Sequence, residues 1–319
     1  MQVIEKTDGF RDLQPGCVAT IGKFDGVHTG HQLILQQLRS KATELGLPSM
    51  VILIEPHPEE FFAKQPQDCP ARLSELEEKL ALLEEQGVDF VFKLRFDEHL
   101  QKQSAQDYIE SMLIKGLGVA CLIIGNDFRF GNQRKGDFAL LKEYGERFGF
   151  ELIESASCIH NGIRISSTYV REQLQKGDFE LVELLLNRPY AISGTVVKGQ
   201  QLGRDLGFPT CNVRLNRKNL PLHGVYACDV KVDNIDMAER LLKGAANIGY
   251  RPTVSEGSKA ILEVHLLDFD SDIYGERITV IFRHKIREER KFESLQALQT
   301  CIAIDVQTVR EFFAKDMPL

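Results

Sequence analysis

The sequence predicts an α/β domain with a parallel sheet, followed by a small antiparallel β-barrel and a C-terminal helix. Over residues 16–186 short apolar runs alternate with helical patterns, and such alternation builds a parallel sheet covered by helices. From residue 190 to 282 the chain has short β-rich runs separated by Gly, Pro and Asn, as in a small barrel. The 319 residues also exceed the size, about 250–300 residues, at which single cores stop growing.

Each element of the first half follows from its hydrophobic pattern. The expected strands are continuous apolar runs, at Cys17–Ile21, Met50–Ile54, Val88–Phe92, Val119–Ile124 and Phe150–Ile153. The expected helices have apolar residues at helical spacing, at Gly30–Leu45, Ser74–Glu85, Ser104–Ile114, Asp137–Arg147, Thr168–Gln175 and Asp178–Leu186. A helix between each pair of strands keeps the strands parallel.

The pattern changes at Asn187-Arg188-Pro189, because a proline disfavours helix in the residue before it. We therefore predict two domains, residues 1–186 and 187–319. The expected barrel strands include Ala191–Val197, Gly224–Val232, Ala260–Leu267 and Arg277–Phe282, and one amphipathic helix is expected at Ser294–Ala314.

Composition and charge exclude several classes of protein. Hydrophobic residues make up 43% and charged residues 27%, which is ordinary globular composition. No run approaches the ~18 uncharged apolar residues of a membrane helix, and the first residues lack the blocks of a signal peptide. The seven cysteines show no C-x-x-C spacing, which favours reduced thiols over a zinc site. We expect a cytoplasmic protein with no membrane partner.

The formal net charge of −7 is unevenly distributed, with −9 on residues 1–186 and +2 on residues 187–319. Neither part has the basic footprint of a nucleic-acid binder, so no nucleic-acid partner is expected. An anionic substrate must then be held by local features, such as a helix N-terminus and a few cations.

The first expected strand runs into a segment that combines glycines with two histidines. Gly22, Gly26 and Gly30 permit tight turns and close approach of the backbone to a ligand. His28 and His31 stand three residues apart at the start of a helix, so both rings can point to one side. This pattern favours a phosphate site suited to nucleotidyl transfer, which needs hydrogen-bond donors around the reacting phosphates. The alternative is one capping and one surface histidine.

A second cluster follows the last strand of the sheet. Ser166, Ser167 and Thr168 open a helix, with Arg171 one turn further along. Three hydroxyls and a guanidinium can hold the β- and γ-phosphates of a nucleotide, whereas simple N-capping is the alternative. A position on the same sheet edge as the histidines favours the phosphate site.

At these residues the chain resembles a known family. H-x-G-H together with I-S-S-T-x-x-R is the signature of the nucleotidylyltransferase superfamily, and longer strings resemble the bacterial bifunctional riboflavin kinase/FMN adenylyltransferases, or FAD synthetases. The matching strings are GKFDGVHTGHQ (22–32), EPHPEEFF (55–62), GNDFRFG (125–131), ISSTYVREQLQKGD (165–178), GRDLGFPTCN (203–212), GVYACDV (224–230), ANIGYRPT (246–253), LEVHLLDF (262–269) and IREERKF (286–292).

The resemblance implies a Rossmann-like domain that joins FMN to the AMP part of ATP. It implies catalytic roles for His28, His31 and Arg171. His57 would contact flavin, although a rigid turn after the second strand is an equal alternative. Asn126 stands where the family pattern usually has Asp. The implied nucleotide contacts of this domain are Gly22, Phe24, Asp25, Gly30, Asn126, Asp127, Ser166, Ser167 and Thr168.

The second half contains no conventional kinase motif, and by itself shows only a Gly-rich loop of the kind that is usually a hairpin turn. The resemblance implies a riboflavin kinase barrel. Thr210 and Asn212 would hold Mg²⁺ with its nucleotide, because both offer hard oxygen ligands, and Cys211 replaces the usual Ala between them. Glu263 would be the catalytic base. The implied remaining contacts are Gly199, Gly203 and Arg204 to nucleotide, and Arg287 and Glu289 to flavin.

The leading hypothesis is therefore a two-step enzyme. Riboflavin and MgATP give FMN, and FMN with a second ATP gives FAD and pyrophosphate. FMN and FAD are substrate and product rather than permanent cofactors, and no obligate protein partner is expected. Two alternatives remain open: a barrel that only binds flavin as a regulatory module, and an RNA-linked protein, which the negative charge argues against.

Overall fold

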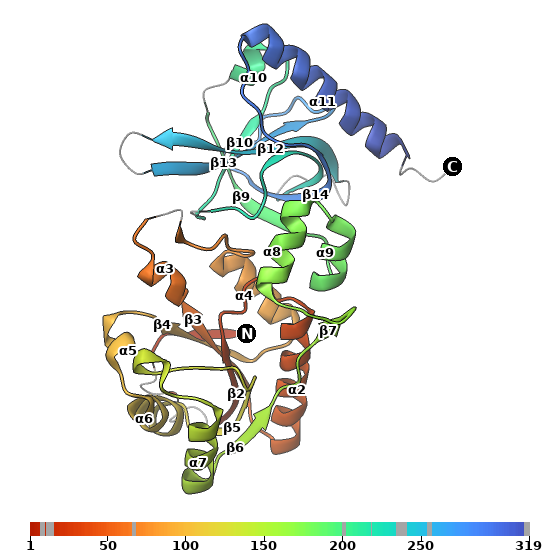
Figure 1. Cartoon of the computed structure of the whole chain (residues 1–319). Coiled ribbons are helices and arrows are strands. Elements are labelled where there is room, and N and C mark those ends of the chain that lie inside the picture. Colours follow the sequence, from red (N-terminus) through yellow and green to blue (C-terminus); the bar gives the residue numbers. More distant parts are fainter. Residues whose placement is uncertain are drawn as a thin grey trace. The chain divides into compact units, whose positions relative to one another are not determined.

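The computed structural model describes residues 1–6, 10, 16–65, 68–199, 202–217, 219–233, 241–253 and 257–315 (Figure 1). It forms two compact units. The first contains residues 1–70 and 76–167, and the second contains residues 71–75 and 168–319. No helix in the described part of the chain has both the length and the apolar composition needed to span a membrane.

The first unit is built on a six-stranded sheet with strand order β1-β4-β3-β2-β5-β6. Every pair of neighbouring strands is parallel, which confirms the predicted fold class. The strands are β1 (Gln2–Ile4), β2 (Cys17–Gly22), β3 (Ser49–Glu55), β4 (Phe90–Arg95), β5 (Val119–Ile124) and β6 (Glu151–Glu154). The three-residue edge strand β1 was not predicted, because its pattern is too short to stand out.

Helices cover both faces of this sheet, so its central strands are apolar on both sides. Cys17, Ala19 and Ile21 of β2 belong to one core cluster, whereas Val18 belongs to the other. The first cluster packs under η2 and α7, and the second under α2 and α4. The helices are α2 (Thr29–Leu45), α3 (Pro58–Phe62), α4 (Leu76–Glu85), α5 (Glu98–Lys102), α6 (Ala105–Asp107), the π-helix η2 (Tyr108–Gly116), the 3₁₀ helix η3 (Asn132–Arg134) and α7 (Phe138–Phe148).

The second unit is a closed antiparallel barrel with strand order β10-β13-β12-β11-β14-β9, as predicted. Its strands are β9 (Ala191–Val197), β10 (Cys211–Arg214), β11 (Gly224–Val232), β12 (Leu242–Thr253), β13 (Gly257–Leu266) and β14 (Arg277–Arg287). The C-terminal helix α11 (Leu295–Lys315) was also predicted, and it packs on the barrel through Val306 and Val309.

Three further segments belong to the barrel unit. The helix α9 (Phe179–Leu186) places Phe179 against the rings of Tyr226 and Phe282. The Lys285 ammonium donates to the Gln175 carbonyl of α8 (Ser167–Lys176). Residues 71–75 are held by the buried Arg217, which donates to the Leu73 carbonyl. The domain boundary after residue 186 stays a prediction.

The hairpin of β7 (Ile159–His160) and β8 (Ile163–Arg164) precedes α8 and belongs to the first unit. Residues 200 and 201, in the middle of the predicted Gly-rich loop, lie outside the described residues. The rest of that loop contains a short helix, α10 (Leu202–Asp205).

Candidate functional site

Two candidate sites lie on the chain, one in each unit. The first lies where β2 ends and α2 begins. His28 is the N-cap of α2, and its Nδ1 accepts the backbone N–H of His31 at 3.3 Å. The two imidazoles are stacked, with centroids 3.7 Å apart. The structure thus brings the two histidines together as predicted, and His28 also takes the capping role that was the alternative.

Glycine makes this stack possible. A Cβ at Gly30 would lie 3.1 Å from the His28 ring, and a Cβ at Gly22 would lie 3.1 Å from the ring of Phe24. Phe24 in turn packs on His31, with centroids 4.8 Å apart. The backbone of this turn also needs a left-handed residue at Gly26, where φ is 78°. The geometry of the turn therefore favours glycine at these three positions.

His31 is held in its neutral form. Burial is the main cause that keeps its pKa well below the usual value of 6.5, and the positive charges of Lys79 and Lys23 act in the same direction. Its Nδ1 is buried and has no hydrogen-bond partner among the described residues. A neutral imidazole at a helix N-terminus can donate one hydrogen bond to a phosphate oxygen.

The Ser166–Arg171 motif divides between the two units. The Ser167 hydroxyl donates to the Asp25 carbonyl at 2.9 Å, which joins the motif to the histidine loop. Ser166 also lies in the first unit, whereas Thr168 and Arg171 lie in the second. The Arg171 Nε donates to the Ala71 carbonyl at 2.5 Å. The phosphate contacts expected of these side chains stay predictions.

Asn126 and Asp127 follow β5 and are exposed. The Asp127 carboxylate accepts from Arg164 at 2.7 Å, and this bond holds the pKa of Asp127 below its usual value. The Arg129 guanidinium donates to the Asn126 carbonyl at 3.0 Å. Both predicted nucleotide contacts therefore lie after a strand of the sheet, and Asp127 forms an ion pair with Arg164.

His57 is buried directly after β3, at the N-cap of α3. Its Nε2 lies 3.1 Å from the Nζ of Lys79, a fully buried lysine on α4 that the sequence analysis missed. The signal was present, because Lys79 lies on the apolar stripe formed by Leu76, Leu80 and Leu83. A lysine on the buried stripe of a helix is unusual.

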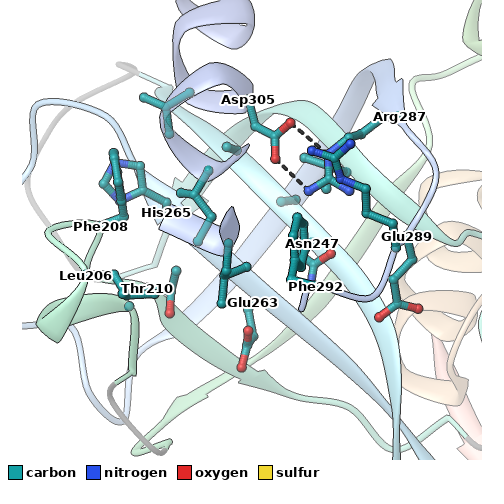
Figure 2. A pocket seen from close by; sticks show the side chains of 18 of the residues that line it. Leu206, Phe208, Thr210, Asn247, Glu263, His265, Arg287, Glu289, Phe292 and Asp305 are labelled. Atoms are coloured by element: carbon teal, nitrogen blue, oxygen red, sulfur yellow. Dashed lines mark hydrogen bonds and ion pairs between the residues drawn. The ribbon is translucent and has the colours of Figure 1, made fainter. Parts of the chain in front are cut away.

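The second site lies in the barrel unit, around a cavity of about 300 Å³ that we call the helix-side cavity (Figure 2). Apolar side chains such as Phe208 and Phe292 line it, together with Ile302 and Val306 of α11. Its polar lining is Thr210, Asn212, Asn247, Glu263, His265, Arg287, Glu289, Arg290 and Asp305. Together with Gly203, six residues predicted from the sequence are therefore gathered around one cavity.

Strand register explains how the central residues meet. Glu263 of β13 lies opposite Asn212 of β10 and opposite Asn247 of β12. The buried Leu262 and Val264 flank Glu263 and point into the barrel core, so Glu263 is on the other face of the strand. Asn247 was not predicted, because its place in this row depends on the register of β12 and β13.

The backbone of Gly199 and of Gly203 lies close to the predicted magnesium ligands, Asn212 and Thr210, because glycine has no Cβ. A Cβ at Gly199 would collide with the side-chain amide of Asn212. A Cβ at Gly203 would lie 3.2 Å from the Thr210 hydroxyl and would collide with the Phe208 carbonyl. Thr210 and Asn212 thus lie against glycine backbone, and both offer hard oxygens of the kind that Mg²⁺ prefers. Their role as magnesium ligands stays a prediction. Among the described residues no cluster of three His, Cys, Asp or Glu could hold a metal.

A second cavity of about 320 Å³, the loop-side cavity, is lined by residues 269–274 and shares Thr210 with the first. Arg204 and Cys211 also line it. Burial raises the pKa of the Cys211 thiol to about 11, and its Sγ lies 3.3 Å from the Val264 carbonyl. Cys211 thus presents a neutral thiol at the position where the family has Ala.

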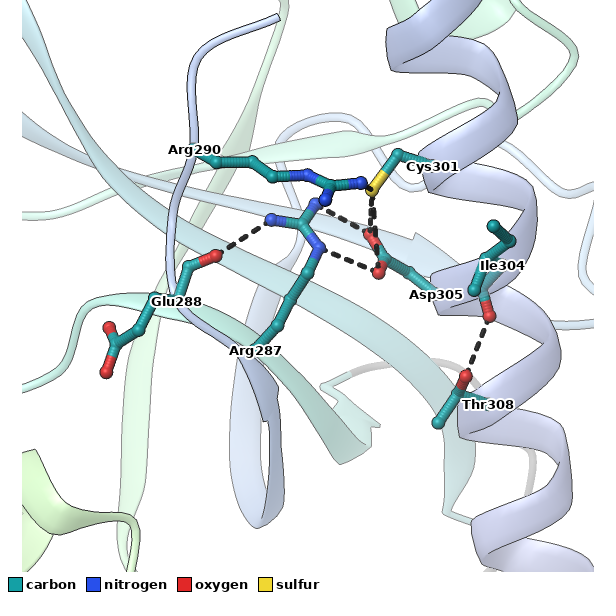
Figure 3. A network of polar contacts seen from close by, with 7 residues as sticks. All are labelled: Arg287, Glu288, Arg290, Cys301, Ile304, Asp305 and Thr308. Carbon is teal, nitrogen blue, oxygen red and sulfur yellow. Dashed lines mark hydrogen bonds and ion pairs between the residues drawn. The ribbon is translucent and has the colours of Figure 1, made fainter.

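The edge of the helix-side cavity is fixed by an ion pair (Figure 3). Arg287 Nε and Nη2 donate to the two carboxylate oxygens of Asp305 on α11, at 2.8 and 2.7 Å. The pair raises the pKa of Arg287. Arg290 lies beside it, with Nη2 2.6 Å from the Cys301 Sγ. Glu289 is packed so closely on Gly249 that a Cβ there would collide with its carboxylate.

Comparison with known proteins gives two family matches. The FAD synthetase family matches residues 11–169, and the riboflavin kinase family matches residues 186–313. The chain is 48% identical to a bifunctional riboflavin kinase/FMN adenylyltransferase of Pseudomonas fluorescens, over 98% of both chains. It is 48% identical to the protein of that name from Escherichia coli K12, over 96% of this chain and 95% of the other.

A solved structure is similar along nearly the whole chain. It is titled a macrolide-efflux protein from Streptococcus pneumoniae, and it matches with a TM-score of 0.78 and 28% identity over 97% of this chain and 98% of that one.

Proposed function

The chain belongs to the family of bifunctional riboflavin kinases/FMN adenylyltransferases, and from this premise we propose that it makes FAD from riboflavin at two separate sites. The barrel unit phosphorylates riboflavin, and the α/β unit adenylylates the FMN that results. The observation that carries the assignment of the kinase site is the pair of adjoining cavities that share Thr210, with Glu263 lining the helix-side cavity.

In the kinase step the helix-side cavity takes riboflavin. Its aromatic and aliphatic lining suits the flavin ring, and Asn247 and Arg287 offer hydrogen-bond donors to ring oxygens. The loop-side cavity takes ATP. Phosphoryl transfer then occurs near Thr210, where the two cavities adjoin.

Glu263 is the base of this step. Its carboxylate accepts the proton of the terminal ribityl hydroxyl while that oxygen forms a bond to the γ-phosphorus, and ADP leaves. Thr210 and Asn212 would hold Mg²⁺, which when bound neutralises charge on the phosphates. Gly199 lets the loop backbone lie directly against the Asn212 side chain, where any Cβ would collide with the amide.

In the adenylylation step a phosphate oxygen of FMN attacks the α-phosphorus of ATP, and pyrophosphate leaves. The chain supplies donors rather than a nucleophile. His28 and His31 lie at the N-terminus of α2, where a helix favours negative charge. The low pKa of His31 keeps its ring neutral and able to donate to a phosphate oxygen.

We also propose that the protein works in the cytoplasm. All seven cysteines are free thiols, which supports a reducing compartment.

The test is a time course with riboflavin and MgATP, in which the flavins are separated by chromatography. FMN should appear first and FAD later. H31A should stop the reaction at FMN, whereas E263A should leave riboflavin unchanged and still convert added FMN to FAD. One substitution that removes both activities from a folded protein would contradict the two-site assignment. A wild-type protein that leaves riboflavin unchanged but converts FMN would make the barrel a flavin-binding module.

A further inference from the structure

The buried lysine of the first unit lies outside every motif of the family resemblance. The side chain of Lys79 is 0% exposed. Its Nζ lies 3.1 Å from His57 Nε2 and 3.3 Å from Glu55 Oε2. Removing an ammonium from water is unfavourable unless acceptors surround it. The ring nitrogen and the carboxylate are such acceptors, so these contacts are what permits the lysine to be buried.

The chemistry of the ammonium fixes the direction of its bond to His57. A charged lysine has three donor hydrogens and no acceptor, so His57 Nε2 must accept. The Glu55 carboxylate beside Nζ favours the charged form of the lysine. Because Nε2 accepts, the single ring proton of the neutral imidazole lies on Nδ1. His57 is therefore held as an Nδ1–H donor.

The place of this pair in the sheet connects it to the first site. Glu55 is the last residue of β3, and β3 pairs in parallel with β2, which leads into the His28 loop. Ligands of such sheets bind at the carboxyl edge of the strands. Lys79 also contributes to the low pKa of His31, so its charge acts on a residue of that site.

We propose that Lys79 is a positioning residue of the adenylyltransferase site, where it holds His57 as a neutral donor to an oxygen of FMN. The inference rests on the proposed adenylylation of FMN and on His57 as a flavin contact. Lys79 itself touches no substrate. Without it, His57 loses the donor that fixes its tautomer and becomes free to take a second proton.

Charged and titratable groups from several elements surround His57, and each is considered in the expected pH dependence. Lys79 on α4 contacts the His57 ring, and Glu55 at the end of β3 pairs with Lys79. Glu59, two residues further along α3, pairs with Lys23 from the β2–α2 loop, and His31 on α2 is affected by the charges of Lys79 and Lys23. Lys79 is the one that the structure places at 3.1 Å from the ring nitrogen. Its removal therefore has the largest effect on whether His57 becomes protonated.

The first experiment uses the wild-type full-length chain. Its histidine ring nitrogens are labelled with ¹⁵N, and the His57 signals are assigned by their loss in H57N. We expect a neutral Nδ1–H ring throughout the range from about pH 5.5 to 8, around the ordinary histidine pKa of about 6.5. An Nε2–H tautomer, or an ordinary titration in that range, would overturn the proposal without reference to activity.

The second experiment measures adenylylation of FMN by K79M, which keeps most of the side-chain length and removes the donor. The KM for FMN should rise about tenfold with a smaller change in kcat, and a new dependence on pH should appear near 6.5. In an H57N background K79M should change the KM less than twofold, because the lysine acts through His57. K102M, at an exposed lysine of α5, is the matched control and should match wild type.

Riboflavin phosphorylation by the same K79M chain reports whether the barrel unit is folded, and the far-UV circular dichroism and thermal unfolding of the K79M chain report whether the unit that contains Lys79 is folded. Retained phosphorylation with an unchanged KM for FMN refutes the role of Lys79. If K79M fails to fold, the tautomer in the wild-type chain decides the question. A wild-type chain that forms no FAD at all would instead refute the proposed function, so the two failures are distinguishable.

Discussion

Replacing Asp305 with asparagine should weaken both the barrel unit and its binding of riboflavin. Asp305 joins α11 to β14 through its two-bond contact with Arg287 (Figure 3). The side chains of Arg287 and Asp305 are 22% and 8% exposed. Breaking a fully buried pair costs about 3–5 kcal/mol. We expect about 2–3 kcal/mol of unfolding free energy here, because Arg287 keeps part of its hydration.

The same substitution should raise the KM for riboflavin. Asp305 fixes the orientation of Arg287 at the edge of the helix-side cavity. Once released, Arg287 must be ordered again on binding, and ordering one long side chain costs about 0.5–1.5 kcal/mol. The KM should therefore rise about two- to tenfold, while adenylylation of added FMN stays unchanged.

The chain provides a matched control in a second ion pair. Arg310 donates from Nη1 and Nη2 to both oxygens of Asp268 at 2.8 and 2.7 Å. This is also a two-bond contact, although Arg287 uses Nε and Nη2. Its side chains are 43% and 74% exposed, and exposed pairs contribute about 0–1 kcal/mol. In thermal unfolding, D305N should lower the Tm by about 5–10 °C, whereas D268N should leave the Tm nearly unchanged. Equal shifts for the two variants would refute the argument from burial.

Three further outcomes are expected. The high pKa of Cys211 keeps its thiol protonated, so iodoacetamide should alkylate Cys211 slowly at pH 7.5, and rapid alkylation would contradict the raised pKa. C211A should keep the KM of the kinase reaction within twofold of wild type. Since Arg164 lowers the pKa of Asp127, the carboxylate stabilises the fold above its ordinary pKa of 3.8 and this contribution is lost as pH falls through the lowered value. Because Asp127 is exposed, D127N should cost under about 1 kcal/mol at pH 7. Denaturant unfolding should show that this difference from wild type decreases as the pH falls below 3.8. G199A should reduce FMN formation more than about tenfold, because the added methyl displaces Asn212, and should leave FAD formation from FMN intact. Equal losses of both activities would show misfolding.

The sequence predicted the fold where the hydrophobic pattern is regular. The parallel sheet, the barrel strands β9, β11 and β14, and the helix α11 all have such patterns. The twelve-residue strand β12 was missed because Gly244 and Gly249 resemble turn punctuation. In the barrel these glycines are sites of close approach: a Cβ at Gly244 would lie 3.0 Å from the His265 carbonyl, and one at Gly249 would collide with Glu289.

The helix predicted at Ser104–Ile114 is present as α6 followed by the π-helix η2. The apolar spacing identified a helix there, because buried residues such as Ile109 and Leu113 are four apart. It did not distinguish α from π hydrogen bonding, since that choice depends on how the segment packs on the sheet.

The candidate sites were predictable to the extent that their residues are neighbours in sequence. His28 and His31 lie on one helical turn, and their stack follows from that spacing. Asn247, Asp305 and Lys79 were missed because each meets its site only through tertiary structure: by strand register, by docking of α11, and by packing of α4. Such tertiary contacts cannot be inferred from the residues of a short motif.

The two candidate sites differ in the backbone geometry that would bind polyphosphate to an acidic chain. At the first site a helix N-terminus and the neutral imidazole of His31 offer donors; burial lowers the pKa of His31, and the cations Lys79 and Lys23 lower it further. At the second site a row across β10, β13 and β12 places amides beside a single carboxylate, Glu263. The first arrangement suits a reaction in which the substrate supplies the nucleophile, and the second suits one in which a hydroxyl must lose its proton. Since the described contacts of Glu263 and of His31 lie within separate units, substitutions at each should remove one activity and leave the other.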